Sequence, residues 1–357
     1  MKTTVVDLFC GIGGLTHGLE RAGLNVVAGF DIDPTCKYAY EENNNAEFIE
    51  ADIANVCHEK INSYYSGSDI RILVGCAPCQ PFSKYTMRYR KNTDNDDNCN
   101  KNHRKWNLVK SFADTIRLIL PDVVSMENVP ELVNTQVFKD FIETLNSLDY
   151  NVSYNVAFCP DYGVPQNRKR LVLLASRLGE ISLIEPEYSP DIYKTVKDAI
   201  FDIPKIKAGE RCKKDSLHFS ASLNDKNLAR IKASKQGGTW RDWNEDLQLD
   251  CHKKNSGKTY ASVYGRMQWD LPSPTITTQF YGYGNGRFGH PKQDRAISMR
   301  EGAILQSFPP NYKLIEEGVA TKIRVLGTHI GNAVPVELGR AIGLSIKNHI
   351  LEVTAHE

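Results

Sequence analysis

A short segment with two cysteines carries the residues best suited to covalent chemistry. Cys76 and Cys79 are spaced C-x-x-C in residues 75–83, directly after residues 70–74 (IRILV), which predict a buried strand. The carboxyl ends of such strands are where open α/β proteins place their ligands. A thiol at this position is a candidate nucleophile, metal ligand or redox partner.

The surroundings of the two cysteines argue against a metal or redox site. A zinc site of this kind needs a second ligand pair at matching spacing, which is not supplied by Cys57-His58, Cys99 or Cys159-Pro160. A thioredoxin-like site needs a helix right after the motif, whereas Pro81 and the polar run to residue 107 predict a loop. We therefore predict no metal, a single nucleophilic thiol at Cys79, and Cys76 as a small core residue.

A second group of candidate residues lies near the amino end. Residues 3–9 predict a buried strand and residues 11–14 (GIGG) open a helix, a turn at which a ligand can approach the backbone closely. Asp31 ends the second predicted strand, where a carboxylate can accept hydrogen bonds from ribose hydroxyls. Thr16 occupies the third glycine position of the dinucleotide pattern, which favours another adenosine-bearing ligand. Asp52 could reach an adenine amino group; an ordinary tight turn and a helix cap are the alternatives.

These segments belong to a regular alternation of strands and helices. Strands are predicted at residues 3–9, 26–32, 48–51, 70–75 and 123–127, and helices at residues 15–22, 36–43, 108–120 and 138–148. The alternation is typical of a doubly wound, mostly parallel α/β sheet. Two later strands, at residues 155–158 and 170–175, are expected to complete the sheet as an antiparallel edge.

The composition changes after the sheet. From residue 178 to residue 310, Pro, Gly, Lys, Asn and aromatic residues are frequent and apolar runs are short, which indicates a second, smaller, loop-rich lobe. An amphipathic helix at residues 339–349 is expected to pack back on the first lobe. We therefore predict a large domain at residues 1–178, a small domain at residues 179–315, and a C-terminal segment at residues 316–357 that returns to the large domain.

Charge and cysteine usage narrow the class of protein. The formal net charge is +1, but basic residues crowd into residues 84–105, 205–214 and 226–241. These runs indicate either a polyanion-binding surface or solvated basic faces. No uncharged stretch nears the length of a membrane span, and the nine cysteines follow no regular framework. We expect a soluble intracellular protein with reduced thiols and no membrane association.

Six segments, in the same order, resemble signature motifs of the cytosine-5 methyltransferases. They are residues 7–14 (DLFCGIGG), 78–83 (PCQPFS), 127–130 (ENVP), 166–170 (QNRKR), 300–309 (REGAILQSFP) and 331–336 (GNAVPV). They cover nearly the whole chain outside the second lobe. The resemblance implies a Rossmann-like S-adenosylmethionine-dependent methyltransferase fold, with residues 1–178 as the catalytic and cofactor-binding domain and residues 179–315 as the target-recognition domain.

The resemblance implies a covalent route to methylated cytosine. In the family a cysteine thiolate adds to C6 of the base, which makes C5 able to attack the methyl group of the cofactor. Here that nucleophile is Cys79, and Glu127 would hydrogen-bond or protonate the ring at N3. Arg168 and Arg170 alternate with Lys169 on a predicted strand, so both guanidinium groups share one face and would hold the O2 atom of the base. A pair of surface salt bridges is the alternative for the arginines.

By the same resemblance, S-adenosyl-L-methionine is the cofactor. Asp31 would bind its ribose, and Ile32 would pack on its adenine. The full set of residues expected to bind it is Phe9, Gly11, Ile12, Gly14, Asp31, Ile32, Asp52, Ile53, Pro78, Leu108 and Asn332.

Double-stranded DNA is the partner that the resemblance implies. A stacked cytosine cannot be attacked from above its ring, so the base must be flipped out of the helix. The basic, Asn-rich loop at residues 83–107 has the composition to close over DNA, with Ser83 and Lys84 as candidate contacts; mobility without function is the alternative. Sequence choice should lie in the second lobe, where the candidate contacts are Arg241, Thr275, Thr277 and Gln279.

Two other functions remain open. The tRNA-methylating branch of the family shares the catalytic motifs, although the large second lobe favours DNA. A non-catalytic DNA-binding relative usually lacks part of the Cys, Glu or Arg set, which is complete here. The resemblance implies a bacterial cytoplasmic enzyme, associated with the nucleoid through DNA. Such an enzyme usually protects DNA against a restriction endonuclease that acts on the same site, without a stable complex between the two proteins.

Overall fold

The computed structural model describes residues 1–78, 96–255, 257, 263–320 and 322–355, and of residues 96–107 the backbone alone. The predicted nucleophile Cys79 and the predicted DNA contacts Ser83 and Lys84 lie outside the described residues. The chain divides into two compact units. Unit 1 contains Met1–Phe158, Lys169–Pro186 and Val334–Glu357, and unit 2 contains Cys159–Arg168 and Glu187–Ala333.

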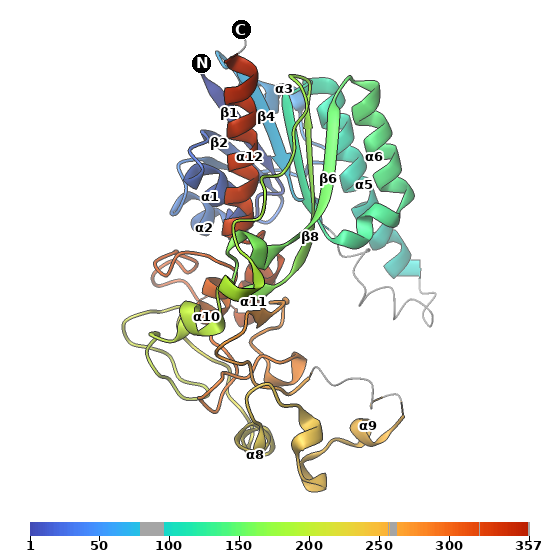
Figure 1. Ribbon diagram of the computed structural model, residues 1–357. Coiled ribbons are helices and arrows are strands. Elements are labelled where there is room, and N and C mark those ends of the chain that lie inside the picture. Colours follow the sequence, from blue (N-terminus) through green and yellow to red (C-terminus); the bar gives the residue numbers. More distant parts are fainter. Residues whose placement is uncertain (79–95, 256, 258–262, 321, 356–357) are drawn as a thin grey trace. The chain divides into compact units, whose positions relative to one another are not determined.

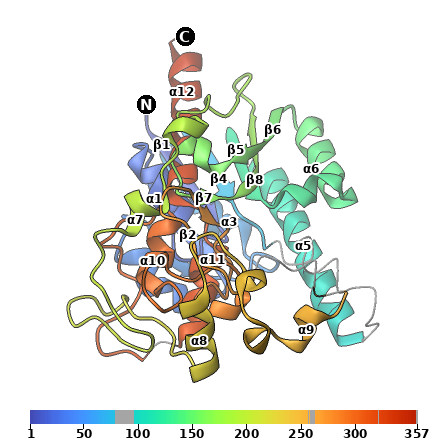
Figure 2. The same cartoon turned by 60° about the horizontal axis from the view of Figure 1, so that its bottom comes forward.

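Unit 1 is built on a seven-stranded sheet with the order β3-β2-β1-β4-β5-β8-β6 (Figures 1 and 2). The neighbours from β3 to β5 pair in parallel, whereas β8 is antiparallel to β5 and to β6. The predicted fold class, a doubly wound and mostly parallel α/β sheet, is confirmed. The strands are β1 (Thr3–Leu8), β2 (Val26–Asp31), β3 (Glu47–Glu50), β4 (Ile70–Gly75), β5 (Val123–Asn128), β6 (Asn151–Phe158) and β8 (Lys169–Ser176).

The two late strands complete the sheet at one edge, as predicted, and β8 is antiparallel to both of its neighbours. β8 inserts between β5 and β6, so β6 is the edge strand. The burial of the two strands explains the order: Leu171 and Leu173 of β8 are fully buried, whereas Tyr154 and Val156 of β6 are 46% and 49% exposed. An interior strand needs apolar residues on both faces, and an edge strand tolerates exposure.

Helices cover both faces of the sheet (Figure 1). Over one face, Phe112 of α5 and Phe141 of α6 join Leu8 of β1 in one apolar core. On the other face α1 and α12 pack closely, because a Cβ on Gly18 would stand only 2.5 Å from the carbonyl oxygen of Val336. The helices of unit 1 are α1 (Gly14–Arg21), α2 (Lys37–Glu41), α3 (His58–Ser63), α5 (Asp96–Ile119), α6 (Gln136–Ser147) and α12 (Val336–Thr354).

None of the helices in the described parts of the chain combines the length and the apolar character needed to cross a membrane.

Unit 2 is rich in loops, as predicted for the second lobe (Figure 2). A short parallel sheet joins β7 (Gln166–Asn167) to β9 (Ser273–Pro274). Buried polar groups also hold the loops together: Arg295 donates two hydrogen bonds, of 2.6 and 2.7 Å, to the carboxylate of Glu301, and both side chains are fully buried. The helices are α7 (Val196–Ile200), α8 (Asp225–Ala233), α9 (Asp250–Lys253), α10 (Met299–Leu305) and α11 (Ile323–Asn332).

Candidate active site

The turn after β1 and the end of β2 form one hydrogen-bonded corner of unit 1. The backbone N–H of Gly11 donates to Oδ2 of Asp31 at 2.9 Å, and the N–H of Asp33 donates to Oδ1 at 2.9 Å. Gly11 and Gly13 have φ angles of +50° and +82°, which glycine adopts without steric cost. Asp31 thus fixes the shape of the turn that opens α1.

An open apolar surface borders this corner. The side chain of Ile32 is 58% exposed although it directly follows a buried strand. A Cβ on Gly11 would meet no atom within 4 Å, so the space beside the turn is open. An adenine ring would cover Ile32, and ribose hydroxyls could donate to the carboxylate of Asp31. The residues present therefore fit an adenosine-bearing cofactor.

The remaining cofactor candidates of unit 1 differ in exposure. Ile12, Gly14 and Ile53 are buried, so their side chains or backbone build the wall behind the corner. The half-buried candidates, which keep some surface for a ligand, are Phe9, Pro78 and Leu108.

The last two cofactor candidates, Asp52 and Asn332, differ in their local contacts and in the unit to which they belong. The carboxylate of Asp52 accepts hydrogen bonds from the Ala54 N–H and the Asn55 side chain, both at 3.1 Å, as an aspartate in a local turn does. This agrees with the capping role considered as its alternative, and it still leaves the residue half-buried at the end of β3. Asn332 is exposed at the end of α11 and belongs to unit 2.

Asp7 is a buried carboxylate that the motif pattern alone does not single out. It lies within β1 with no exposed surface, accepts a 2.7 Å hydrogen bond from the Thr16 hydroxyl, and through it connects to the hydroxyl of Tyr40, 3.0 Å from Thr16. Burial, together with the charge of Asp31, raises the pKa of Asp7 to about 7, against the lowering effect of Thr16. In the sequence, the signal that could have identified Asp7 is a charged residue within an otherwise apolar strand.

Glu127 lies at the end of β5 and is held by two side chains. It is 3% exposed, and its Oε1 lies 2.9 Å from Nε of Arg170 on the adjacent β8. The thiol of Cys76, directly after β4, donates to Oε2 at 2.7 Å. The contact from Arg170 is not aligned as a hydrogen bond, so Oε1 has no hydrogen-bond partner among the described residues. A ligand group beside this oxygen could therefore complete its hydrogen bonding.

Asn128 connects the end of β5 to the segment that leads to Cys79. Its side-chain amide donates to the carbonyl oxygen of Ala77 at 3.1 Å, and its Oδ1 accepts from the Val129 N–H at 2.9 Å. Asn128 is 1% exposed. The backbone two residues before Cys79 is therefore anchored to the strand that carries Glu127.

The strand that was predicted to carry both arginines contains only Arg170. The sheet pairing is interrupted at Arg168, which lies between β7 and β8 and belongs to unit 2, whereas Arg170 belongs to unit 1. The Arg168 guanidinium is buried and donates to the carbonyl oxygens of Ile276 at 2.9 Å and Gly331 at 3.0 Å. These two carbonyl oxygens hold the Arg168 side chain within unit 2. A sequence pattern cannot show where such carbonyl oxygens lie.

The glutamine of the same motif reinforces this network. Oε1 of Gln166 accepts from the Ile276 N–H at 2.8 Å, and its amide donates to Oε1 of Gln306 at 2.9 Å. Both glutamines are fully buried. They are residues that the motif comparison did not assign, and their burial gives them a scaffolding role in unit 2.

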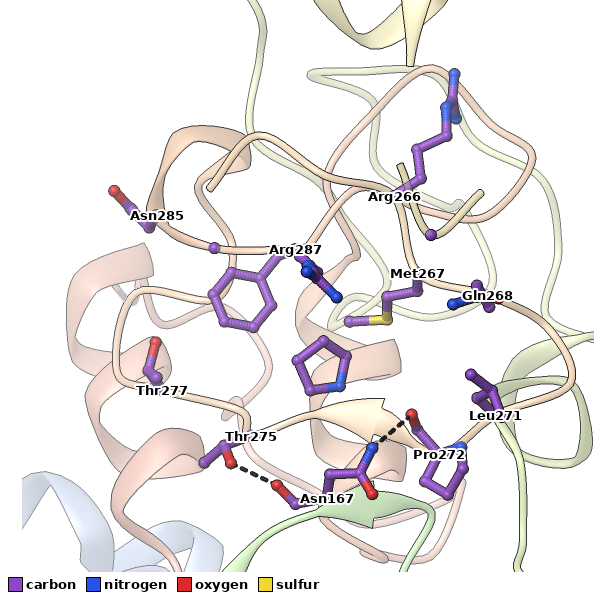
Figure 3. A pocket seen from close by; sticks show the side chains of 14 residues that line it. Asn167, Arg266, Met267, Gln268, Leu271, Pro272, Thr275, Thr277, Asn285 and Arg287 are labelled. Atoms are coloured by element: carbon purple, nitrogen blue, oxygen red, sulfur yellow. Dashed lines mark hydrogen bonds between the residues drawn. The ribbon is translucent and has the colours of Figure 1, made fainter. Parts of the chain in front are cut away.

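A cavity of about 410 Å³ opens in unit 2 and includes two predicted DNA contacts, Thr275 and Thr277 (Figure 3). Figure 3 shows the Arg287 guanidinium turned into the cavity toward Met267, whereas Arg266 points away from it. None of the described residues that line the cavity is acidic. They are Asn167, Gly237, Arg266, Met267, Gln268, Leu271, Pro272, Pro274, Thr275, Thr277, Asn285, Gly286, Arg287 and Phe288.

The predicted DNA contacts differ in whether their side chains already make contacts within the protein. The hydroxyl of Thr275 donates to the Asn167 carbonyl oxygen at 2.6 Å, so it stabilises the β7–β9 pair. Thr277 is exposed and also lines the cavity. Gln279 and Arg241 are exposed outside the set of lining residues, and the Arg241 guanidinium lies 5.7 Å from the ring centroid of Trp240.

Comparison with known proteins gives one consistent family. Residues 3–348 match the profile of the family described as C-5 cytosine-specific DNA methylase. The chain is 51% identical over 353 residues to the type II methylase M.HgiDII of Herpetosiphon aurantiacus, covering 98% of this chain and 96% of that protein. It is 30% identical to the type II methyltransferase M1.HphI of Haemophilus parahaemolyticus, covering 97% and 87%.

Solved structures share the fold. A prophage-encoded E. coli protein described as a DNA modification methyltransferase superposes with a TM-score of 0.73 at 20% identity, covering 98% of this chain and 100% of that one. The Entamoeba histolytica methyltransferase EhMeth superposes with a TM-score of 0.63 at 16% identity, covering 98% and 99%.

Proposed function

Because the chain belongs to the C-5 cytosine-specific DNA methylase family, we propose that it transfers a methyl group from S-adenosyl-L-methionine to C5 of a flipped-out cytosine in a specific short duplex DNA sequence. The observation that carries the proposal is the buried Glu127, held by Arg170 beside the segment that leads to Cys79. The target cytosine must gain a hydrogen bond at N3 while its C6 atom is attacked, and a carboxyl group at that place can supply this hydrogen bond.

The steps follow from the residues of this chain. The Cys79 thiolate forms a bond to C6 while the ring electrons shift toward C5 and N3, and Glu127 hydrogen-bonds or protonates N3. S-adenosyl-L-methionine, when bound, supplies an electrophilic methyl group. C5 takes this methyl group; loss of the C5 proton to a base then breaks the Cys79–C6 bond and restores the aromatic ring. Arg170 holds Glu127 and would hold O2 of the base, and Arg168 acts as a positioning residue through Ile276 and Gly331.

The corner between β1 and β2 would hold the cofactor. Asp31 binds the ribose hydroxyls, Ile32 covers the adenine, and the turn from Phe9 to Gly14 faces the methionine part, with Ile12 as the buried wall. Asp52 and Ile53 would complete the adenine wall, and Pro78 and Asn332 would contact the cofactor. Leu108 is a weaker candidate.

Unit 2 would choose the target sequence. Its cavity presents Thr277 and Arg287, and the described residues that line it include no carboxylate, which suits a strongly acidic ligand such as DNA (Figure 3). Thr275 would act by shaping the cavity, since its hydroxyl is bound to Asn167. Arg241 and Gln279, both exposed, would contact DNA outside the cavity, as would Ser83 and Lys84.

The relatives named as type II methylases support a protective role in a restriction-modification system. A cognate endonuclease would act on the same site without a stable complex with this enzyme. Because its substrate would be chromosomal DNA, the enzyme would act in the bacterial cytoplasm, at the nucleoid.

One experiment tests the reaction and the nucleophile together. The protein and its Cys79→Ser variant are incubated with labelled S-adenosyl-L-methionine and either duplex DNA of mixed sequence or tRNA, and 5-methylcytosine is mapped at base resolution. We expect methyl groups at one short DNA motif, and none with Cys79→Ser. Transfer to tRNA alone would replace the DNA proposal by the RNA one, and activity in Cys79→Ser would overturn the covalent route. A duplex with 5-fluorocytosine should trap the active enzyme covalently, because fluorine replaces the proton that must leave C5.

A further inference from the structure

Cys76 is a half-buried thiol that the reaction as described does not use. Its sequence position, three residues before the nucleophile, predicts a small core residue. In the structure its Sγ instead donates to Oε2 of Glu127 at 2.7 Å. The two residues are 51 positions apart in the chain, so the contact exists because β4 and β5 are neighbours in the sheet.

We propose that Cys76 is a positioning residue for Glu127: its thiol holds Oε2, so that Oε1 is directed at the target base. The inference rests on the proposed function, since it presumes that Glu127 contacts the base. In the described part of unit 1, the titratable groups that contact Glu127 are the Arg170 guanidinium, from β8, and the Cys76 thiol, from the segment after β4.

The backbone around Cys76 is held by hydrogen bonds on both sides. The backbone N–H of Cys76 donates to the carbonyl oxygen of Leu8 at 3.2 Å, which extends the β1–β4 pairing by one residue. The carbonyl of the next residue, Ala77, accepts from Asn128 at 3.1 Å. Glu127 itself is fixed by the pairing of β5 with Val172 of β8. The backbone at both ends of the thiol–carboxylate contact is therefore fixed, which keeps the two side chains within reach of each other.

A carboxyl group held at one oxygen only can still rotate about its last side-chain bond. Arg170 contacts Oε1 alone, and without a well-aligned hydrogen bond. The donor at Oε2 therefore sets the plane of the carboxyl group. A thiol is a weak donor, so it orients the group while stabilising the carboxylate form less than a hydroxyl would. That suits a group that must hydrogen-bond or protonate N3 and then return to its starting state.

The test compares Cys76→Ala, which removes the donor, with Cys76→Ser, which replaces it by a stronger one. kcat, KM for DNA and for S-adenosyl-L-methionine, and the pH profile of kcat are measured on the full-length protein. We expect Cys76→Ala to lower kcat about tenfold with both KM values unchanged. Cys76→Ser should recover most of kcat. The limb of the profile that reports Glu127 should move to higher pH in Cys76→Ala and to lower pH in Cys76→Ser, because donors favour the carboxylate form.

Thermal unfolding and cofactor binding of each variant show whether it is folded. If Cys76→Ala does not fold, the direction of the shift in Cys76→Ser alone decides. Wild-type kcat and an unshifted limb in Cys76→Ala would overturn the inference, as would equal losses in both variants without any shift, which would leave Cys76 as a space-filling residue.

Glu127→Gln separates this inference from the proposed function. If Glu127→Gln retains wild-type methyl transfer, the role proposed for Glu127 fails, and the inference fails with it. If Glu127→Gln is inactive and Cys76→Ala equals the wild type, only the role of Cys76 is removed.

Discussion

The amide of Asn128 donates to the carbonyl oxygen of Ala77 at 3.1 Å and thereby ties the segment before Cys79 to the strand that carries Glu127. Both ends of this bond are buried. Ala77, two residues before the proposed nucleophile, is therefore anchored to the residue that follows the proposed acid Glu127.

Asn128→Ala should disturb the chemistry more than the binding of the cofactor. Loss of a buried hydrogen bond of this kind costs about 1–3 kcal/mol, which lowers kcat about tenfold to a hundredfold if it is expressed in the transition state. Single-turnover methylation measures the effect, and calorimetry should show S-adenosyl-L-methionine affinity within about twofold of wild type. Asn151→Ala, at the exposed start of β6, is the matched control. A loss of cofactor affinity equal to the loss of rate would show that Asn128 supports the whole edge of the sheet instead.

Asp31→Asn should weaken cofactor binding about tenfold or more. The two carboxylate oxygens of Asp31 accept from the backbone N–H groups of Gly11 and Asp33. An asparagine offers only one acceptor oxygen, so one of these two N–H groups would face the side-chain NH₂ group instead. Titration calorimetry with S-adenosyl-L-methionine measures the change. Asp33→Asn is the local control, because that carboxylate accepts from Thr35 instead. Equal affinity in Asp31→Asn and wild type would remove the proposed ribose site.

The sheet is the part of the fold that the sequence predicts well. Mostly apolar runs such as residues 70–74 are bounded by turns, and their alternation with helices leaves few other folds. The order of the strands is harder to predict from the sequence. Whether β8 lies inside the sheet or at its edge depends on its pairing with β5, which is distant in the chain. An alternating R-K-R pattern cannot reveal that β8 begins only after Arg168.

Contacts within the site were harder still to predict. Motif resemblance points to Glu127 and Arg170, and the structure brings these two together at 2.9 Å. The contact of Cys76 with Glu127 could not be predicted, because the two residues are 51 positions apart in the chain.

Stability should fall as the pH drops from neutral toward 4, in part through His290. Burial lowers the pKa of His290 to about 4, and its Nδ1 accepts from the backbone N–H groups of Lys292 and Gln293, which requires an unprotonated nitrogen. The unfolded chain takes up this proton below about pH 6.5, whereas the folded chain does so only near pH 4, so stability is lost between these values. At pH 5 the loss is about 2 kcal/mol.

Urea unfolding at pH 7.5 and pH 5 checks this contribution. His290→Asn, which keeps an acceptor near Nδ1, should be less stable at pH 7.5 but lose less stability on acidification than wild type. His58→Gln, in unit 1, should keep the wild-type pH dependence. The same pH dependence in His290→Asn as in wild type would assign the acid sensitivity to other groups.

Thr277 and Thr275 should respond differently to loss of their hydroxyls. Thr277→Val removes an exposed group that lines the cavity, so it should change target preference or DNA affinity without lowering stability. Thr275→Val removes the 2.6 Å bond to Asn167, so it should lower the melting temperature by several degrees. A methylation panel of related sequences and thermal melts measure the two effects. The reverse pattern would exchange the roles of the two threonines.

Arg287→Ala should weaken DNA binding while cofactor affinity stays intact. Figure 3 shows its guanidinium turned into the cavity, and none of the described residues that line this cavity is acidic, so its charge is available to DNA. The expected loss is about tenfold in affinity, and Arg177→Ala, on the surface of unit 1, is the control. Binding to cognate and altered duplexes at several salt concentrations identifies the contact. A phosphate contact lowers affinity for all duplexes and reduces the salt dependence by about one charge, whereas a guanine contact relaxes preference at one position. Unchanged affinity, preference and salt dependence would exclude Arg287 from the DNA-binding surface.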